Sequence, residues 1–336
     1  MPSLLPAVAS RLFVHTRLAS AHPLDGAYAS LVRGRSMDFE DLRDYQFGDD
    51  VRDVDWKATA RHGELLVKRS RARRMHSVVF AVDVGLDMAS LSPDERPKSE
   101  LAILAVGAIG LLSHRHGDDV SVILGDASGS TRLPARRSEG ALELALRTIR
   151  DRTGAAESTG PSSNADTNAP EDSSGETGAR RDATAPTGAG SADPRDRTTN
   201  DTPSDRAALL ASIVQTVKRR SIVVVVAGES PLDEREEKLL RRLQAQHDVL
   251  WVSVRDADPV ALRGAVDART RWRVPAHLRG NKRVLAEIAE QRTRDDAARD
   301  ELLDRLEVSH VELDHADTAI PRILRMLARR PRVRGS

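Results

Sequence analysis

The sequence has no cysteine, few aromatic residues and no long apolar run, and each absence excludes a class of protein. Without cysteine there is no disulfide, no thiolate metal site and no cysteine nucleophile. No stretch of about 18 apolar residues is present, so we expect no membrane-spanning helix. The first residues include Pro2, Pro6 and Arg11 and lack the uninterrupted apolar stretch of a signal peptide. We therefore expect a cytoplasmic protein.

An excess of either charge is also missing. Lysine and arginine number 52 and aspartate and glutamate 51, which leaves a net charge of +1. No overall electric field therefore draws the chain to nucleic acid or to a membrane. The 336 residues suggest about two domains. An apolar fraction of 39% beside a charged fraction of 31% indicates a very charged surface or an unfolded part.

One long segment has no large apolar residue at all. Between residues 151 and 204 there is no Val, Ile, Leu, Met, Phe, Tyr or Trp. Such a segment cannot bury enough surface to offset the entropy lost on ordering. We expect a disordered insertion that is simply solvated, with a tether or a phosphorylated segment as the alternative.

Six expected strands, the central ones apolar throughout, alternate with helical segments, which is typical of a doubly wound, mostly parallel α/β sheet. The expected strands are Ser77–Asp83, Val120–Gly125, Thr131–Leu133, Ile222–Ala227, Val249–Val254 and Val308–Leu313. The third is expected to fold back antiparallel after a turn. The expected helices cover residues 97–116, 138–150, 205–220, 232–246, 276–306 and 316–328.

These elements suggest how the chain is divided. We expect an N-terminal helix or tail over residues 1–24 and a small, charged, β-rich module over 25–76. The sheet domain follows in two halves, 77–150 and 205–330, with the insertion 151–204 between them and a short tail over 331–336. A long excursion in a loop after the third strand costs the sheet little.

The segment from Gly34 to Lys68 places oppositely charged residues beside aromatic ones. Asp55 is suited to cap a short helix, Trp56–Arg61, and the turn at His62 and Gly63 leads into a strand, Leu65–Val67. We expect a small, mostly extended module that packs against the sheet domain.

The arginines of this segment can act in two ways. Arg43, Arg52 and Arg61 can each form a bidentate pair with a nearby carboxylate. A structural salt-bridge lattice is the favoured interpretation, and a binding face for a partner is the alternative. The segment has no recognisable nucleophile with its base, and His62 is its only histidine, so a catalytic role is not indicated. We expect Trp56 to be buried against the sheet domain.

The segment resembles the signature of a bacterial family called domain of unknown function 58. The matching positions are Gly34, Asp38, Phe39, Arg43, Tyr45, Gly48, Asp49, Arg52, Asp55, Trp56, Thr59, Ala60, Arg61, Leu65, Val67 and Lys68. Two departures are Val54, where isoleucine is usual, and a basic run after Lys68. The candidate site residues of this module are Arg43, Tyr45, Gly48, Asp49, Arg52, Asp55, Trp56 and Arg61.

The family is similar to von Willebrand factor A-type domains, which implies a six-stranded doubly wound sheet. Those domains often hold a divalent cation at the end of the first strand, on a D-x-S-x-S loop and later Thr and Asp residues. Here Asp83 is retained, Gly85 and Asp87 replace the two serines, and Gly228 or Glu229 stands at the later acid. No later threonine can be placed.

Two hydroxyl ligands are therefore missing, and a degenerate, metal-free loop is the favoured interpretation, so we expect no cofactor. An intact cation site is one alternative. A weak Mg²⁺ or Ca²⁺ site made by Asp83, Asp87 and Glu229 is another, because oxygen ligands suit these ions.

The resemblance implies a non-enzymatic adaptor that acts with a MoxR-type AAA+ ATPase in chaperone-like assembly or maturation; the client is not indicated. One alternative is a metal-dependent hydrolase that uses Asp83, Asp87 and Glu229. Another is nucleic-acid binding through the basic run Lys68–Arg74. No aromatic residue interleaves with this run, so a solvated edge or an acidic partner is favoured over nucleic acid.

Overall fold

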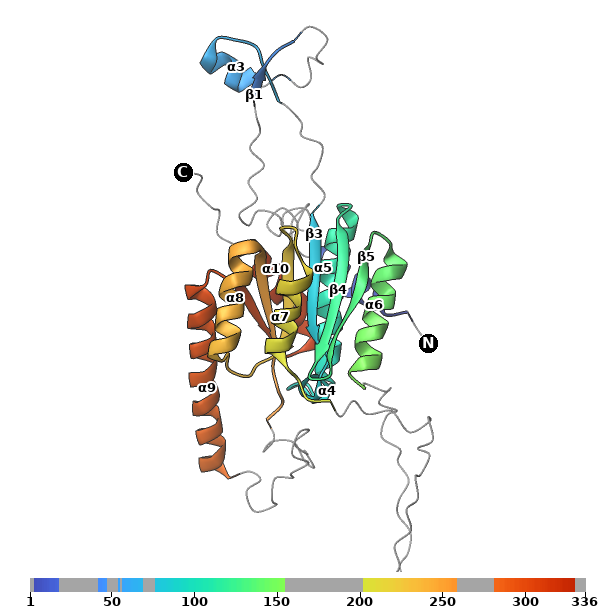
Figure 1. Ribbon diagram of the computed structural model, residues 1–336, viewed down its shortest axis with the longest axis vertical. Coiled ribbons are helices and arrows are strands. Elements are labelled where there is room, and N and C mark those ends of the chain that lie inside the picture. The colour runs from blue at the N-terminus through green and yellow to red at the C-terminus, as the bar shows by residue number, and fades with distance from the viewer. Residues whose placement is uncertain are drawn as a thin grey trace, which may run out of the picture.

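The computed structural model describes residues 3–17, 42–46, 54, 56–68, 76–154, 202–258 and 281–329. Its largest feature is a six-stranded sheet in the order β5-β4-β3-β6-β7-β8 (Figure 1). The strands are β3 (Ser77–Asp83), β4 (Asp119–Asp126), β5 (Gly129–Arg136), β6 (Ile222–Gly228), β7 (Asp248–Val254) and β8 (Ser309–Leu313). Among the described strands of this sheet, only the β4–β5 pair is antiparallel. The doubly wound, mostly parallel sheet and its six predicted strands are confirmed.

The central strands are apolar throughout because both faces of the sheet are covered. Every residue of β6 is buried, and in β3 only Ser77 is partly exposed. Successive side chains of a strand point to opposite faces. Phe80 accordingly belongs to one apolar cluster, and its neighbour Val79 belongs to another on the opposite face, with Trp251.

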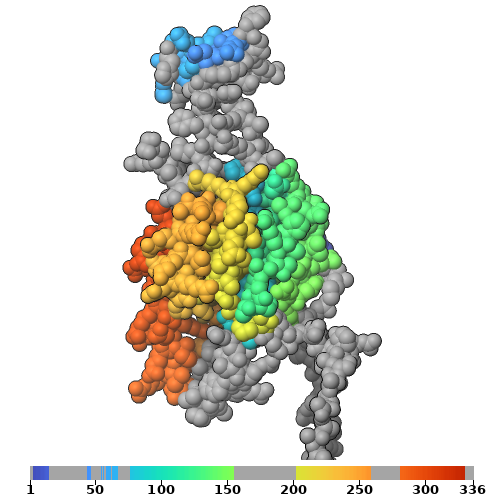
Figure 2. Space-filling model, in the orientation of Figure 1, coloured from blue at the N-terminus to red at the C-terminus, as the bar shows by residue number. Residues whose placement is uncertain are grey.

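Helices cover both faces of the sheet (Figure 1). On the face of Phe80 lie α1 (Leu4–Arg17), α5 (Lys98–Arg115), α6 (Glu139–Arg152) and α10 (Ala316–Arg329). On the other face lie α7 (Arg206–Thr216), α8 (Glu234–Gln246) and the end of α9 (Lys282–Arg305). Figure 2 shows α7 and α8 side by side over this face. Among the described residues, no helix is long and apolar enough to cross a membrane.

The N-terminal helix α1 is part of the sheet domain's core. Its residues Val8 and Leu12 are buried against α5, α6 and α10. A Cβ on Gly107 of α5 would lie 2.9 Å from the Cγ1 of Val8, so the glycine lets the two helices approach closely. The carboxylate of Glu143 accepts hydrogen bonds from the first backbone amides of α1, at Leu4 and Leu5. These bonds satisfy amides that a helix start leaves unpaired.

The insertion is anchored at both ends, inside the boundaries that the sequence suggests. Helix α6 continues to Arg152, and the following Thr153 is buried. The segment Thr202–Asp205 is also ordered, and it leads into α7. The prediction of disorder over 151–204 was therefore wrong at its ends, because these residues bond to the sheet domain. Residues 155–201 lie outside the described part of the chain.

The small module consists of β1 (Leu42–Asp44), α3 (Trp56–His62) and β2 (Leu66–Lys68). The two strands pair antiparallel, and the predicted short helix and following strand are confirmed within a residue. Figure 1 shows this module apart from the six-stranded sheet. The predicted burial of Trp56 was wrong: its side chain is 62% exposed. Val54 and Leu66 fill the interior of this module instead, and the indole lies outside it.

Candidate functional site

The sheet has a topological switch point between β3 and β6. From β3 the chain goes on to β4 on one side, whereas β6 lies on the other. Ligands of open α/β sheets bind at the carboxyl ends of the strands at such a point. We use the name carboxyl edge for the ends of β3, β6 and β7 with residues 84–91, 202–205, 229–232 and 255–257. The short helix α4 (Leu86–Ala89) lies at this end of the sheet (Figure 1).

Asp83, the last residue of β3, is a buried carboxyl at the switch point. It is only 1% exposed, and its Oδ1 accepts a 2.8 Å hydrogen bond from the Gly85 amide. Its Oδ2 is buried and makes no hydrogen bond. Burial raises the pKa of Asp83 to about 6, and the charge of Asp87 adds to this, whereas the Gly85 amide, the nearby Ser204 hydroxyl and the Arg206 guanidinium act in the opposite direction.

Ser204 comes to Asp83 from the far side of the insertion. The Leu86 amide donates a 2.8 Å hydrogen bond to the carbonyl of Thr202, and the Ala127 amide donates a 2.9 Å bond to that of Pro203. These bonds hold the returning segment over the ends of β3 and β4. The Ser204 hydroxyl is buried there and makes no hydrogen bond.

Ser204 supplies a hydroxyl where position 85 has none. A Cβ on Gly85 would lie 2.5 Å from the Oγ of Ser204, so the two positions compete for the same space. No later threonine was placed here from the sequence, and Ser204 was not considered, because this serine was assigned to the insertion. The sequence does indicate that ordered structure resumes at Ser204. This serine directly precedes Asp205, whose carboxylate caps α7 by accepting from the Ala208 amide.

Asp83, Asp87 and Ser204 together form a small set of oxygen donors. Two of these groups have a buried oxygen without a hydrogen bond, and such atoms are ordinarily satisfied by water or an ion. Mg²⁺ prefers oxygen ligands and keeps several waters, so this set fits it in chemical type. The set supplies few donors, and its central carboxyl has a raised pKa that opposes ionisation.

Glu229, the third expected ligand, lies in a different cluster. Its carboxylate pairs with Arg255 at 3.1 Å, and the same guanidinium pairs with Glu312 and Asp296. The three carboxylates have oxygens within 4.8 Å of one another. Arg299 also pairs with Asp296 and Glu312, at 2.9 and 3.0 Å. The chain's own guanidinium groups thus balance these acids.

Sequence reasoning also missed Lys98, at the start of α5. Its side chain is fully buried, and its Nζ donates a 2.7 Å hydrogen bond to Oδ1 of Asp256. The same oxygen accepts a 2.8 Å bond from the Ser90 hydroxyl. The ammonium therefore ties the start of α5 to the loop after β7. No local sequence pattern marks this lysine, because its partner lies 158 positions away.

Residues 41–297 match the family described as Protein of unknown function DUF58. The chain belongs to this family. An uncharacterized protein of Mycobacterium tuberculosis and one of Mycobacterium bovis are each 32% identical to this DUF58 protein over 128 residues. The match covers 38% of this chain and 39% of each relative, so the aligned part spans about two fifths of these curated relatives.

Solved structures similar to this DUF58 protein have low identity and low structural scores. A conserved hypothetical protein, BatB from Bacteroides thetaiotaomicron, has a TM-score of 0.39 at 11% identity and covers 75% of this chain and 97% of its own. An aerotolerance-related membrane protein from Bacteroides fragilis has 0.40 at 14%, with 75% and 98% covered. A von Willebrand factor type A protein from Catenulispora acidiphila has 0.35 at 10%, with 76% and 42% covered.

The signature residues of this DUF58 protein are partly within the described structure. The Tyr45 amide donates to the Leu65 carbonyl, and the Leu66 amide donates to the hydroxyl of Thr59, so these residues hold β1, α3 and β2 together. Trp56 and Arg61 are exposed. The signature positions outside the described residues or side chains are Arg43, Gly48, Asp49, Arg52 and Asp55, and the basic run Lys68–Arg74 lies outside them likewise.

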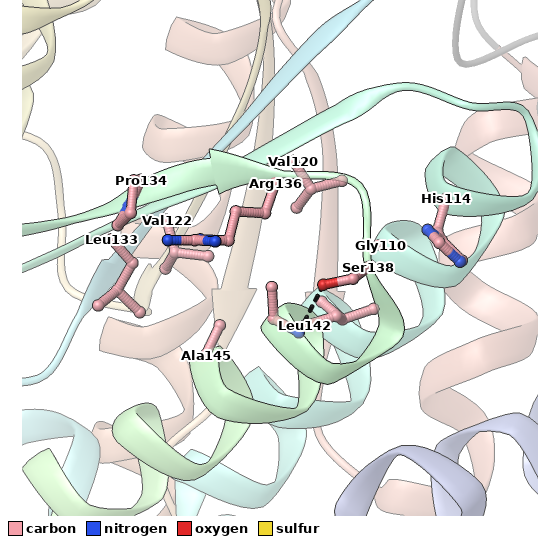
Figure 3. A pocket seen from close by; sticks show the side chains of 11 residues that line it. Gly110, His114, Val120, Val122, Leu133, Pro134, Arg136, Ser138, Leu142 and Ala145 are labelled. Carbon is pink, nitrogen blue, oxygen red and sulfur yellow. Dashed lines mark hydrogen bonds between the residues drawn. The ribbon is translucent and has the colours of Figure 1, made fainter.

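A small hollow lies away from the carboxyl edge, between the β4–β5 pair and helices α5 and α6 (Figure 3). Apolar side chains that include Val122, Leu133 and Leu142 line it, with Arg136 and Ser138 beside them. Its volume of about 20 Å³ holds little more than one water molecule. It is too small for a substrate.

Proposed function

We propose that this DUF58 protein is a non-enzymatic protein-binding component that acts with a MoxR-type AAA+ ATPase in chaperone-like assembly or maturation. The ATPase comes from the family resemblance, and binding as such is supported by the surface of the signature module. The cytoplasmic location expected from the sequence is part of this proposal.

The exposed Trp56 is the observation that carries the proposal. Large aromatic side chains are normally buried, and exposed ones with apolar neighbours mark interaction sites. Trp56 is 62% exposed, and Leu65, another signature residue of the same module, is 46% exposed. Tryptophan is also enriched among the few residues that dominate binding energy in interfaces. The module therefore presents an apolar anchor at a segment that the family resemblance singles out.

The carboxyl edge gives no matching support for catalysis. A nucleophile needs a base within hydrogen-bond reach. The Ser90 hydroxyl bonds to an oxygen of Asp256 that also accepts from Lys98, so this carboxylate is not a free base. A hydrolase built on Asp83, Asp87 and Glu229 would also need Glu229, which pairs with Arg255 instead.

Binding to a MoxR-type ATPase of the same genome tests the proposal. We expect the wild-type chain to bind the purified ATPase in biolayer interferometry, and Trp56→Ala to weaken binding about 30-fold, the scale of an interface hot spot. The melting temperature should stay unchanged, because the indole is exposed. Leu144→Ala, at an exposed leucine of α6, is the matched control and should bind like the wild type.

Two results would contradict the proposal. One is the absence of binding to the ATPase with or without nucleotide. The other is equal binding by the wild type and Trp56→Ala, which would remove the signature module from the interface.

A further inference from the structure

Lys98 stands in a place that is unfavourable for a cation in two independent respects. Its side chain is 0% exposed, and burying an ammonium is costly unless it is paired. It is also the first residue of the 18-residue helix α5, directly after Pro97. The amino end of a helix carries a partial positive charge, which repels a cation. Side chains that break local rules in this way generally answer a requirement of the surrounding site.

The surrounding acids supply the compensation. The Nζ of Lys98 donates to Oδ1 of Asp256 at 2.7 Å, and the Ser90 hydroxyl donates to the same oxygen at 2.8 Å. Asp256 is itself partly open to solvent, with 36% of its side chain exposed. Lys98 also lies within the field of Glu229. Burial and Asp256 raise the pKa of Glu229, whereas Arg292, Arg255 and Lys98 act against this rise.

The ammonium lies at the end of β6, beside the switch point. A Cβ built on Gly228, the last residue of β6, would lie 3.2 Å from the Nζ of Lys98. Glycine thus leaves the space beside this strand end to the ammonium. A larger side chain at 228 would press against it.

The Lys98–Asp256 pair lies where two loops of the carboxyl edge meet. The Lys98 amide donates to the Ser90 carbonyl, and the Ala257 amide donates to the Leu91 carbonyl. The loop after β7 is therefore joined to the loop after α4 by one backbone bond and by the Ser90–Asp256 bond, and Lys98 ties the start of α5 to both loops. A charge at the centre of this arrangement fixes the relative position of the two loops.

We propose that Lys98 is the resident cation of the carboxyl edge. Its ammonium balances Asp256 beside the end of β6 and ties the loops after α4 and β7 to the start of α5. The acidic side chains at the ends of β6 and β7 therefore need no metal to balance their charge. Removal of the ammonium leaves Asp256 as an unbalanced carboxylate that a divalent cation can approach. Glu229, by contrast, keeps its pairs with Arg255 and Arg292.

Replacement of Lys98 by methionine tests this assignment. Methionine keeps the length and apolar character of the chain but leaves Asp256 without its cation. We expect the melting temperature of Lys98→Met to fall by about 10 °C, the scale for breaking a buried ion pair in a domain of this size. Lys238→Met is the matched control, because Lys238 forms an exposed pair with Glu234, and it should melt like the wild type.

A second substitution, at Asp256, shows whether the unbalanced charge causes the fall in melting temperature. Asp256→Asn added to Lys98→Met should recover more than half of the lost melting temperature, because it removes the unbalanced carboxylate. Asp256→Asn alone should be less stable than the double variant, because it strands the buried ammonium. This comparison remains decisive even if Lys98→Met does not fold.

The last measurement is the change in melting temperature when a divalent cation is added. Millimolar Mg²⁺ or Ca²⁺ should raise the melting temperature of Lys98→Met more than that of the wild type, and a chelator should reverse the rise. The double variant retains Asp83 and Ser204 but should show no such extra rise. Equal responses in Lys98→Met and the double variant, or Lys98→Met melting like Lys238→Met, would overturn the proposal. If Lys98→Met does not fold, a double variant no more stable than Asp256→Asn would overturn it.

Discussion

The Cβ that any other residue would place at Gly85 would lie 2.4 Å from the Cα of Ser204. The loop after β3 and the segment before α7 thus meet without room for a side chain. The contact brings the Ser204 hydroxyl to Asp83 and simultaneously forbids a serine at position 85. The carboxyl edge has one hydroxyl donor here, and the backbone geometry decides which residue provides it.

Gly85→Ser is expected to destabilise the protein rather than build a better cation site. The added side chain must displace the backbone of Ser204, and overpacking of this kind costs about 1–3 kcal/mol of unfolding free energy. Gly140→Ala is the control, because a Cβ there meets nothing within 4 Å and the residue lies in helix α6. It should raise stability slightly. Chemical denaturation of both variants gives the comparison, and an unchanged Gly85→Ser would contradict the contact.

Stability should depend on the protonation of Asp83. Its pKa is raised from 3.8 to about 6, so the folded state holds the proton more tightly than the unfolded state. The stabilising contribution is complete below about pH 4 and is lost as the pH rises through about 6. A shift of this size corresponds to about 3 kcal/mol.

Asp83→Asn removes this titration. The free energy of unfolding of the variant minus that of the wild type should increase by about 3 kcal/mol between pH 4 and pH 7. Denaturant titrations at several pH values measure it. Asp87→Asn, at a half-buried carboxyl four residues further along the chain, is the control and should not reproduce the full trend. A constant difference across this range would show that Asp83 does not titrate there.

Metal binding by the wild type is expected to be weak or absent at millimolar Mg²⁺. Asp83 and Ser204 offer two unpartnered oxygens, but the raised pKa of Asp83 opposes the charged form that a metal needs. Calorimetry with Mg²⁺ at neutral pH is the measurement. A micromolar site that disappears in Asp83→Ala would contradict this expectation and support cation-dependent adhesion.

The insertion is expected to be dispensable for folding. Residues 157–201 contain no large apolar side chain, whereas the flanking Thr153 and the hydroxyl of Ser204 are buried and must be kept. A chain in which a short Gly/Ser linker replaces residues 157–201 should melt within a few degrees of the wild type. Calorimetric melting checks this. Loss of a cooperative transition would show that the insertion takes part in the fold.

The sequence by itself determined the elements of the sheet domain. Apolar, β-branched runs such as Ile222–Gly228 and helical stripes such as Lys98–Arg115 are local patterns, and they predicted six strands and their helices. The segment without large apolar residues and the signature residues of the module were equally readable, because composition and spacing are properties of the chain alone.

Only the tertiary structure decided which polar groups meet. Ser204 reaches Asp83 across the insertion, Lys98 finds Asp256 over 158 positions, and Glu229 pairs with Arg255 rather than joining Asp83. These pairings follow from the strand order, which places the ends of β3, β6 and β7 at one edge. The exposure of Trp56 is likewise a tertiary outcome, because an apolar side chain is buried only where another surface packs against it.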